Sequence, residues 1–395
     1  MNWRDAMLAV MRGEPAPGLL FVPRLDIWYN ANRQRGTLPA ELASLDLAGV
    51  AAWLGVGLHS VIPDFVRTGD DRNLHHRGLG FYNNPDFPWI ADFSAIDHRV
   101  IAAPQTLSTI YPTSRGEVTT RIRYGSEFLD SGMSIPDILE PAIKSLDDCP
   151  RVAEVVSKIR IVPAPAAYGR YRDRIGERGL AVAYLSSAAS PVHHIMRDLR
   201  KVEEFFLDLV DDPGPVLALA DALAPVYDAQ IAATLASSAE VALYGANYDD
   251  AITYPPFFEA HIMPWLRKAA DRLHGAGKLL LTHTDGENQR LLPLLCACGF
   301  DVADSICPAP MTRVPLRDYR AAFGRSVTIW GGIPSVMTLR SSCGEAEFRA
   351  YVDGLIEETR PWNNLILSVA DTLPPDADFS RILYIRDRIA EVSTP

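Results

Sequence analysis

The chain has 395 residues, of which 48% are hydrophobic and 22% charged, and its formal net charge is −11. This is the profile of an ordinary globular protein, long enough for two domains or for one large barrel with insertions. The negative charge argues against binding to nucleic acid or to an anionic membrane, because both need a basic face. No apolar run approaches the roughly 20 residues that a membrane span requires.

Five cysteines are an odd number in a chain of this length and imply no disulfide framework, so we expect a cytoplasmic protein. The first eleven residues carry acid and lack a long apolar core. They therefore predict a short amphipathic helix, an N-terminal arm, rather than a signal peptide.

The first half of the chain predicts few regular elements. Short apolar runs predict strands at residues 19–22 and 57–62. Helical patterns lie between them, at residues 39–45 and 47–54. From about residue 70 to 175 the pattern is irregular, which predicts an insertion.

Within this insertion, alternating apolar residues predict an antiparallel strand at residues 118–124, and helices are expected near residues 135–144 and 152–159.

From residue 180 onward strands and helices alternate. Strands are predicted at residues 180–185, 241–244, 278–281, 300–303, 327–330 and 365–369. Helices are predicted at residues 198–234, 256–273, 287–297, 315–322, 344–359 and 378–391. Six strand–helix units and the two early strands make eight, which predicts a (β/α)8 TIM barrel formed by a single domain over residues 1–395. An open, doubly wound sheet is the alternative.

The carboxyl ends of barrel strands share one mouth, where such enzymes keep their chemistry. His283 and Asp285 follow the predicted strand 278–281, and Asp371 follows the last strand. Histidine with carboxylates suits a divalent metal or acid–base work. The alternative for Asp285 is a helix N-cap, and for Asp371 a turn residue.

Other side chains near strand ends are candidates for contacts to a substrate. They are Arg24, Tyr29, Asn30, Asn247, Asp249 and Trp330. Asp249 also fits a turn cap, and the aromatic residues also fit ordinary packing at the rim of a barrel.

Three segments carry a resemblance to a known family: residues 283–286 (His-Thr-Asp-Gly), 329–335 (Ile-Trp-Gly-Gly-Ile-Pro-Ser) and 367–375 (Leu-Ser-Val-Ala-Asp-Thr-Leu-Pro-Pro). With them, the chain resembles the uroporphyrinogen decarboxylase superfamily, and within it the corrinoid-dependent methyltransferases. Residues 23–30 resemble the opening segment of the O-demethylase members. The resemblance implies a (β/α)8 barrel, the fold that the strand count also predicts.

The chain departs from the thiol-methylating relatives, which hold zinc with one histidine and two cysteines. Asp285 and Asp371 stand at the two cysteine positions, and His283 is kept. Carboxylates suit harder metals than thiolates do. This set therefore implies a divalent metal, with zinc as one candidate, that polarises an ether oxygen, or a site without metal.

The resemblance implies a methyltransferase that moves a methyl group from a methoxylated, aromatic small molecule to the Co(I) corrinoid of a separate carrier protein. His283, Asp285 and Asp371 are the expected catalytic and metal-binding residues. A homodimer is the oligomeric state considered. The alternatives are a decarboxylase of the uroporphyrinogen type, which the scarcity of arginine after the first strand disfavours, and a non-catalytic binding barrel.

Overall fold

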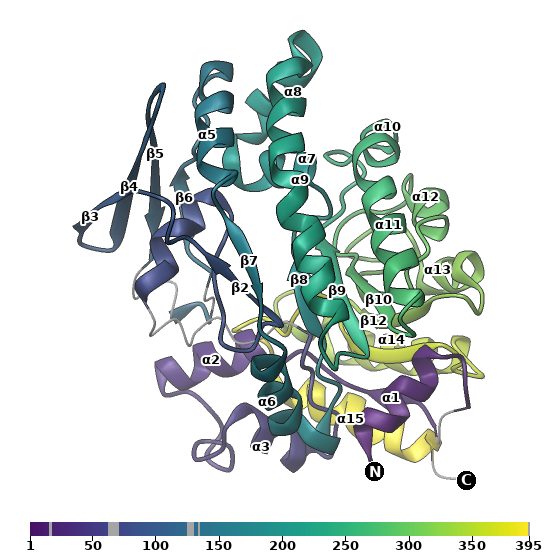
Figure 1. The fold of residues 1–395 in the computed structure, drawn as a ribbon. Coiled ribbons are helices and arrows are strands. Elements are labelled where there is room, and N and C mark those ends of the chain that lie inside the picture. Colours follow the sequence, from purple (N-terminus) through teal and green to yellow (C-terminus); the bar gives the residue numbers. More distant parts are fainter. Residues whose placement is uncertain (16–17, 62–70, 125–129, 133–134, 394–395) are drawn as a thin grey trace.

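The computed structural model describes residues 1–15, 18–61, 71–124, 130–132 and 135–393. A parallel sheet of seven strands lies at its centre, in the order β1-β13-β12-β11-β10-β9-β8 (Figure 1). The strands are β1 Leu20–Phe21, β8 Ala183–Ser186, β9 Val241–Ala246, β10 Leu279–His283, β11 Val302–Ile306, β12 Thr328–Ile333 and β13 Leu365–Val369. Nearly all of their residues are buried, as in other parallel sheets covered on both faces. The prediction of an α/β fold is confirmed.

Helices flank this sheet and connect its strands (Figure 1). The α-helices of the first half are α1 Trp3–Met11, α2 Asp26–Arg35, α3 Leu47–Leu54, α5 Cys149–Val156 and α6 Pro165–Ile175. Those of the second half are α7 Pro191–His194, α8 Val202–Asp211, α9 Pro213–Leu235, α10 Pro255–Phe257, α11 Met263–His274, α12 Leu292–Cys296, α13 Leu316–Phe323, α14 Glu345–Glu358 and α15 Phe379–Ser393. All six strands predicted after residue 180 are present, and each is followed by helical structure.

Among the described residues, α9 has the length and composition of a membrane-spanning helix. Half of its most apolar stretch is buried inside the molecule, where α9 packs against α5 and the strand β7 (Arg160–Pro163). A core helix of the same length has these properties too, so the helix is weak evidence for a membrane.

The second strand predicted, at residues 57–62, is not a regular strand; residue 62 lies outside the described part of the chain. The segment nevertheless hydrogen-bonds on both sides. The Gly57 amide donates to the carbonyl of Phe21 in β1 (3.1 Å), and the Val182 amide donates to the Ser60 carbonyl (3.1 Å). Leu58 forms a parallel bridge with Gly179, just before β8. The segment thus contacts β1 and the chain that enters β8, the two edges of the sheet.

The region predicted as an irregular insertion contains two small antiparallel sheets. One pairs β2 (Trp89–Asp92) with β7. The other has the order β3-β4-β5-β6 and lies at the left of Figure 1. Its strands are β3 Arg99–Ala103, β4 Thr106–Thr113, β5 Gly116–Arg123 and β6 Asp137–Glu140. The strand expected at residues 118–124 corresponds to β5.

The helix predicted at residues 135–144 is wrong, because β6 occupies part of that range. The isoleucine and leucine spacing fits a helix, but pairing with β5 decides the conformation. Ile138 lies opposite Ile122 and packs against a small apolar cluster with Leu74 and Leu107.

Two further helix predictions require correction. Residues 39–45 form successive turns, in which the Leu42 amide donates to the Pro39 carbonyl and the Leu45 amide to the Leu42 carbonyl. The helix expected from residue 287 begins only at Leu292, as α12. The Asn288 side chain donates to the carbonyls of Thr284 and Gly286 and so stabilises a non-helical turn.

Candidate active site

Three polar side chains meet where β10, β11 and β13 end. His283 is the last residue of β10, Asp304 lies opposite it in β11, and Asp371 follows β13. The imidazole of His283 lies between the two carboxylates: Nδ1 is 2.6 Å from Oδ2 of Asp304, and Nε2 is 3.4 Å from Oδ1 of Asp371. His283 and Asp304 are each 3% exposed. The structure thus brings together two of the three residues predicted to be catalytic.

Asp285, the third predicted residue, lies in the same group. One ligand atom each of His283, Asp285 and Asp371 fall within 4.8 Å of one another. Asp285 does not cap a helix, because α12 starts seven residues later. We call His283, Asp285, Asp304 and Asp371 the carboxylate–histidine cluster.

Arg24 binds the cluster from the loop after β1. Its guanidinium donates to Oδ1 of Asp371 (3.1 Å) and to Oδ1 of Asp26 (3.1 Å). Burial alone would lower the pKa of Arg24, but Asp26 and Asp371 outweigh that effect and raise it. Arg24 is therefore a permanent cation that keeps Asp371 negative. Asp371 itself has a positive φ of 55°, and its amide donates to the hydroxyl of Ser305 in β11.

The pKa values in the cluster shift in opposite directions. Burial alone would lower the pKa of His283, but the hydrogen bonds to Asp304 and Asp371 raise it from 6.5 to about 9. Burial alone would raise the pKa of Asp304 and Asp371, yet their contacts with His283 lower both. Burial and the charge of Asp371 raise the pKa of Asp285. In the absence of a metal, the cluster thus holds a proton on His283 at neutral pH.

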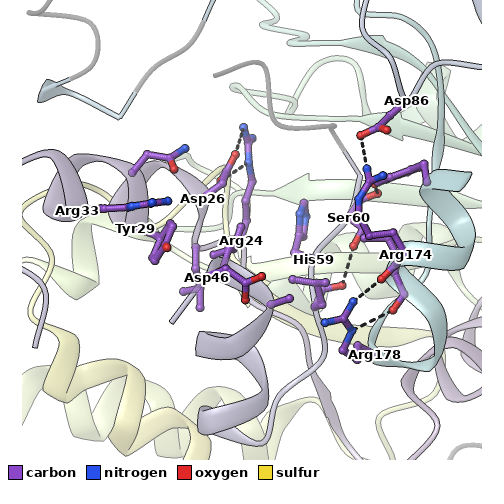
Figure 2. A pocket seen from close by; sticks show the side chains of 17 residues that line it. Arg24, Asp26, Tyr29, Arg33, Asp46, His59, Ser60, Asp86, Arg174 and Arg178 are labelled. Atoms are coloured by element: carbon purple, nitrogen blue, oxygen red, sulfur yellow. Dashed lines mark hydrogen bonds and ion pairs between the residues drawn. The ribbon is translucent and has the colours of Figure 1, made fainter. Parts of the chain in front are cut away.

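A cavity of about 320 Å³ adjoins the cluster. Figure 2 shows Asp26 and Tyr29 on one side of it and Asp86, Arg174 and Arg178 on the other. Its lining residues are Arg24, Leu25, Asp26, Tyr29, Asn30, Arg33, Asp46, Leu47, Ala48, Leu58, His59, Ser60, Asp86, Tyr171, Arg174, Ile175 and Arg178. The lining contains both aromatic and charged side chains, as is common in sites for small polar molecules.

Two lining residues connect the cavity with the cluster. Arg24 bonds Asp371, and Nε2 of His59 lies 3.7 Å from Oδ1 of Asp304. The side chain of Asp371 is 41% exposed, so the cluster is open to solvent at this carboxylate. Arg24 and His59 thus both line the cavity and contact the cluster.

Comparison with known proteins gives matches among solved structures. No family model and no curated protein sequence matches the chain. Among solved structures, a methyltransferase from Methanosarcina mazei superposes with a TM-score of 0.52 at 14% identity, and the match covers 98% of each chain. The chain shares the fold of that methyltransferase. At this identity the likeness concerns the fold alone, so membership of the uroporphyrinogen decarboxylase superfamily stays a prediction.

Three of the six side chains predicted to contact a substrate line the cavity: Arg24, Tyr29 and Asn30. The other three do not. Asn247 is exposed, and its backbone N–H donates to the His283 carbonyl (2.9 Å). Asp249 caps a turn, since its Oδ1 accepts from the Ala251 amide (2.8 Å), which was the alternative interpretation.

Trp330 is fully buried and donates from its indole nitrogen to the Val22 carbonyl (3.1 Å). Its ring centroid lies 4.8 Å from that of His59. The tryptophan is therefore packed beneath the site, where it supports His59.

Sequence reasoning missed Asp304 and His59. Asp304 is an acidic residue within an apolar strand, and a buried charge of that kind requires a partner. His59 lies within the second predicted strand, residues 57–62, directly after Leu58. Both signals were visible in the sequence, but neither identifies the partner.

Proposed function

We propose that this protein is a methyltransferase built on a closed (β/α)8 barrel. It would remove a methyl group from a methoxylated aromatic molecule and deliver it to the Co(I) corrinoid of a partner protein. The hydrogen bonds of residues 57–60 to both edges of the sheet support closure of the barrel. The fold shared with a methyltransferase over nearly the whole chain supports the type of reaction. The corrinoid carrier, a homodimer and a cytoplasmic location are parts of the proposal that rest on the sequence.

The observation that carries the proposal is the imidazole of His283 between Asp304 and Asp371. When a nucleophilic Co(I) attacks the methyl carbon, the electron pair of the carbon–oxygen bond goes to the leaving oxygen. That oxygen must gain a proton or be stabilised by a cation. With its pKa raised to about 9, His283 carries a proton at pH 7 and can donate it from Nε2. Asp304 fixes the ring through Nδ1 and stabilises the imidazolium.

The cluster also fits a divalent metal. Metal-binding histidines commonly donate their other ring nitrogen to a carboxylate, as His283 does to Asp304. Four carboxylates, those of Asp26, Asp285, Asp304 and Asp371, lie in or beside the cluster, and Arg24 pairs with two of them. If all four are ionised and His283 is uncharged, three negative charges are left for a metal ion to balance. His283, Asp285 and Asp371 would hold the ion, which would polarise the ether oxygen as a Lewis acid.

The cavity supports a small aromatic substrate. Its volume of about 320 Å³ lies at the small end of the roughly 300–1,000 Å³ typical of ligand sites. This suits a single ring better than four linked pyrroles, so the decarboxylase alternative is less favoured. Tyr29 and Tyr171 supply aromatic lining, and Arg24 lies near the cluster to orient a polar substituent.

The test mixes the protein with a reduced corrinoid carrier and a panel of methoxyaromatics and follows the spectral change from Co(I) to methyl-Co(III). We expect turnover with at least one donor. His283→Gln should lower the rate roughly 10²- to 10⁴-fold, the usual contribution of a positioned acid. His274→Gln, which changes an exposed histidine also paired with an aspartate, should leave it unchanged.

Two results would contradict the proposal. One is rapid methylation of small thiols from methylcobalamin with every methoxyaromatic inert. The other is demethylation that persists in a double variant with Asp285→Cys and Asp371→Cys, which should bind zinc more tightly and lose ether cleavage. An enzyme that turns over would exclude the non-catalytic barrel.

The leaving oxygen could be stabilised by a metal ion or by the proton of His283. Elemental analysis of untagged protein purified without chelator distinguishes these two mechanisms. His283→Gln should remove one bound equivalent if the cluster holds an ion, since one ligand of three is lost. Full activity after complete removal of metal would assign the reaction to the proton of His283 alone.

A further inference from the structure

A second group of candidate ligands lies in the antiparallel part of the molecule. His75 and His76 are neighbours on a 3-10 helix, Asp71–Leu79, and His98 comes directly before β3. The ring centroids lie 4.1 Å apart for His75 and His76, 4.6 Å for His75 and His98, and 4.9 Å for His76 and His98. One ring nitrogen from each lies within 4.8 Å of the others. We call these residues the three-histidine cluster.

We propose that the three-histidine cluster is a binding site for a borderline divalent transition metal such as Zn²⁺. Imidazole nitrogen is a preferred ligand of zinc, copper and nickel. A zinc ion about 2.0–2.1 Å from each nitrogen would place tetrahedral ligands about 3.3 Å apart. Side-chain rotations that move the ring nitrogens by roughly an ångström would bring them to this spacing. The site is independent of the function proposed for the carboxylate–histidine cluster.

Hydrogen bonds orient two of the three rings for this role. Nδ1 of His98 lies 3.0 Å from the Ile96 carbonyl, which can only accept, so Nδ1 carries the proton and Nε2 the lone pair. The Tyr111 hydroxyl donates to the His75 carbonyl (3.4 Å), and its oxygen is then free to accept from Nδ1 of His76 at 3.2 Å. Both rings therefore present Nε2, in the pattern that outer hydrogen bonds impose on metal-binding histidines.

The ring of His75 has a buried nitrogen that lacks a hydrogen-bond partner among the described residues. The residue is 9% exposed, and the nitrogen is its Nε2. A buried polar atom without a partner costs free energy, and a metal ion is a partner that would remove this cost. Stacking on Phe93, with ring centroids 3.9 Å apart, explains why His76 is buried. Packing of this kind gives the Nε2 of His75 no hydrogen-bond partner.

The charge state of the cluster agrees with this geometry. Burial and the neighbouring His98 lower the pKa of His75 to about 4. Burial, with His75 and His98, lowers the pKa of His76 to about 2. Both rings are thus uncharged near pH 7, the form that binds metal.

The site has room for a fourth ligand. His76 and His98 line an open hollow of about 490 Å³ together with Asn83, Asp92, Phe93 and Ser94. Zinc sites with three protein ligands keep the fourth position for water or a small ligand. The three-histidine cluster therefore has the ligand number of an open site rather than of a closed structural one.

The test uses untagged full-length protein carrying His283→Gln, so that the carboxylate–histidine cluster does not contribute. Co²⁺ is titrated and its visible absorption recorded, and Zn²⁺ is then added in competition with a chelating dye. We expect one equivalent of tetrahedral Co²⁺, displaced by Zn²⁺. Absence of this absorption would overturn the proposal.

Two further variants locate the ion. Adding His98→Ala, a change at an exposed residue, should weaken Zn²⁺ binding by more than the roughly 10- to 100-fold that loss of an outer partner costs. Adding His75→Phe should weaken binding to a similar extent while the thermal midpoint is retained, because an aromatic ring still fills the space. Adding His274→Ala, the matched control outside the cluster, should leave binding intact. Unchanged affinity in the His98→Ala protein would show that the ion lies elsewhere.

Azide tests the open position. It should shift the Co²⁺ spectrum by replacing the fourth ligand, whereas a spectrum that azide leaves unchanged would contradict an open site.

Discussion

Asp371 has two partners that share one of its carboxylate oxygens. Arg24 donates to Oδ1 at 3.1 Å, and Nε2 of His283 lies 3.4 Å from that atom. A buried pair is tolerated only when its charges are matched and hydrogen-bonded, and Asp304 completes the match for His283. The residues of the cluster therefore depend on one another, and the loss of one changes the protonation of the rest.

The stability contributed by His283 should depend on pH in a predictable direction. Its pKa in the folded protein, about 9, lies above the ordinary 6.5. The contribution is therefore fully present below about pH 6.5 and is lost as the pH rises toward 9. In metal-free protein, His283→Gln should lower the free energy of unfolding by about 3–5 kcal/mol at pH 6, the cost of breaking a buried pair. The difference should shrink at pH 9.5.

Urea unfolding of both proteins at several pH values measures this difference. His274→Gln is the control, because His274 pairs with Asp301 at 2.9 Å but its side chain is 42% exposed. That variant should cost less than about 1 kcal/mol. A His283→Gln cost that stays constant from pH 6 to 9.5 would mean that the histidine is not charged in the folded protein.

At the scale of single elements, the close approach of β11 and β12 depends on a missing side chain. Gly331 in β12 has a φ of 152°, and a Cβ there would lie 2.8 Å from the backbone nitrogen and oxygen of Ile306. The same end of β11 contains Asp304 and Ser305, which bind His283 and Asp371. Glycine at this position therefore permits the backbone contact beside the cluster.

Helix α3 begins and ends by simple local rules. Asp46 accepts a hydrogen bond from the Gly49 amide (2.7 Å), and Gly55 ends the helix with a φ of 67°. Asp46→Ala should therefore destabilise the protein by about 1 kcal/mol in thermal or urea unfolding. Asp46→Asn keeps an acceptor and should cost only a few tenths of a kcal/mol. Equal losses in the two variants would instead point to the role of Asp46 in the lining of the cavity.

At the scale of the whole molecule, the contact between residues 57–60 and the chain entering β8 tests closure of the sheet. A Cβ on Gly179 would lie 2.1 Å from the carbonyl oxygen of Leu58, which is backbone and cannot move alone. Gly179→Ala should therefore cost more than about 2 kcal/mol in urea unfolding, because the two segments must separate.

Gly169→Ala is the matched control. Gly169 lies in α6 with nothing near the position of its missing Cβ. Alanine there should be neutral or stabilising by up to about 1 kcal/mol. If Gly179→Ala were equally harmless, the segment would not hold the two edges of the sheet together.

The sequence by itself determined the alternation of strands and helices after residue 180. Short apolar runs next to turn residues are typical of buried strands. Because His283 and Asp371 come at the ends of two such runs, the pattern predicts that they lie close together. The tertiary structure decided what depends on residues far apart in the chain. Asp304 pairs with His283 because β10 and β11 are adjacent, and β6 is a strand because β5 offers an edge. The three-histidine cluster forms only when a 3-10 helix packs against β4 and β5. Local pattern cannot specify such contacts, since the free energy that fixes them comes from partners distant in sequence.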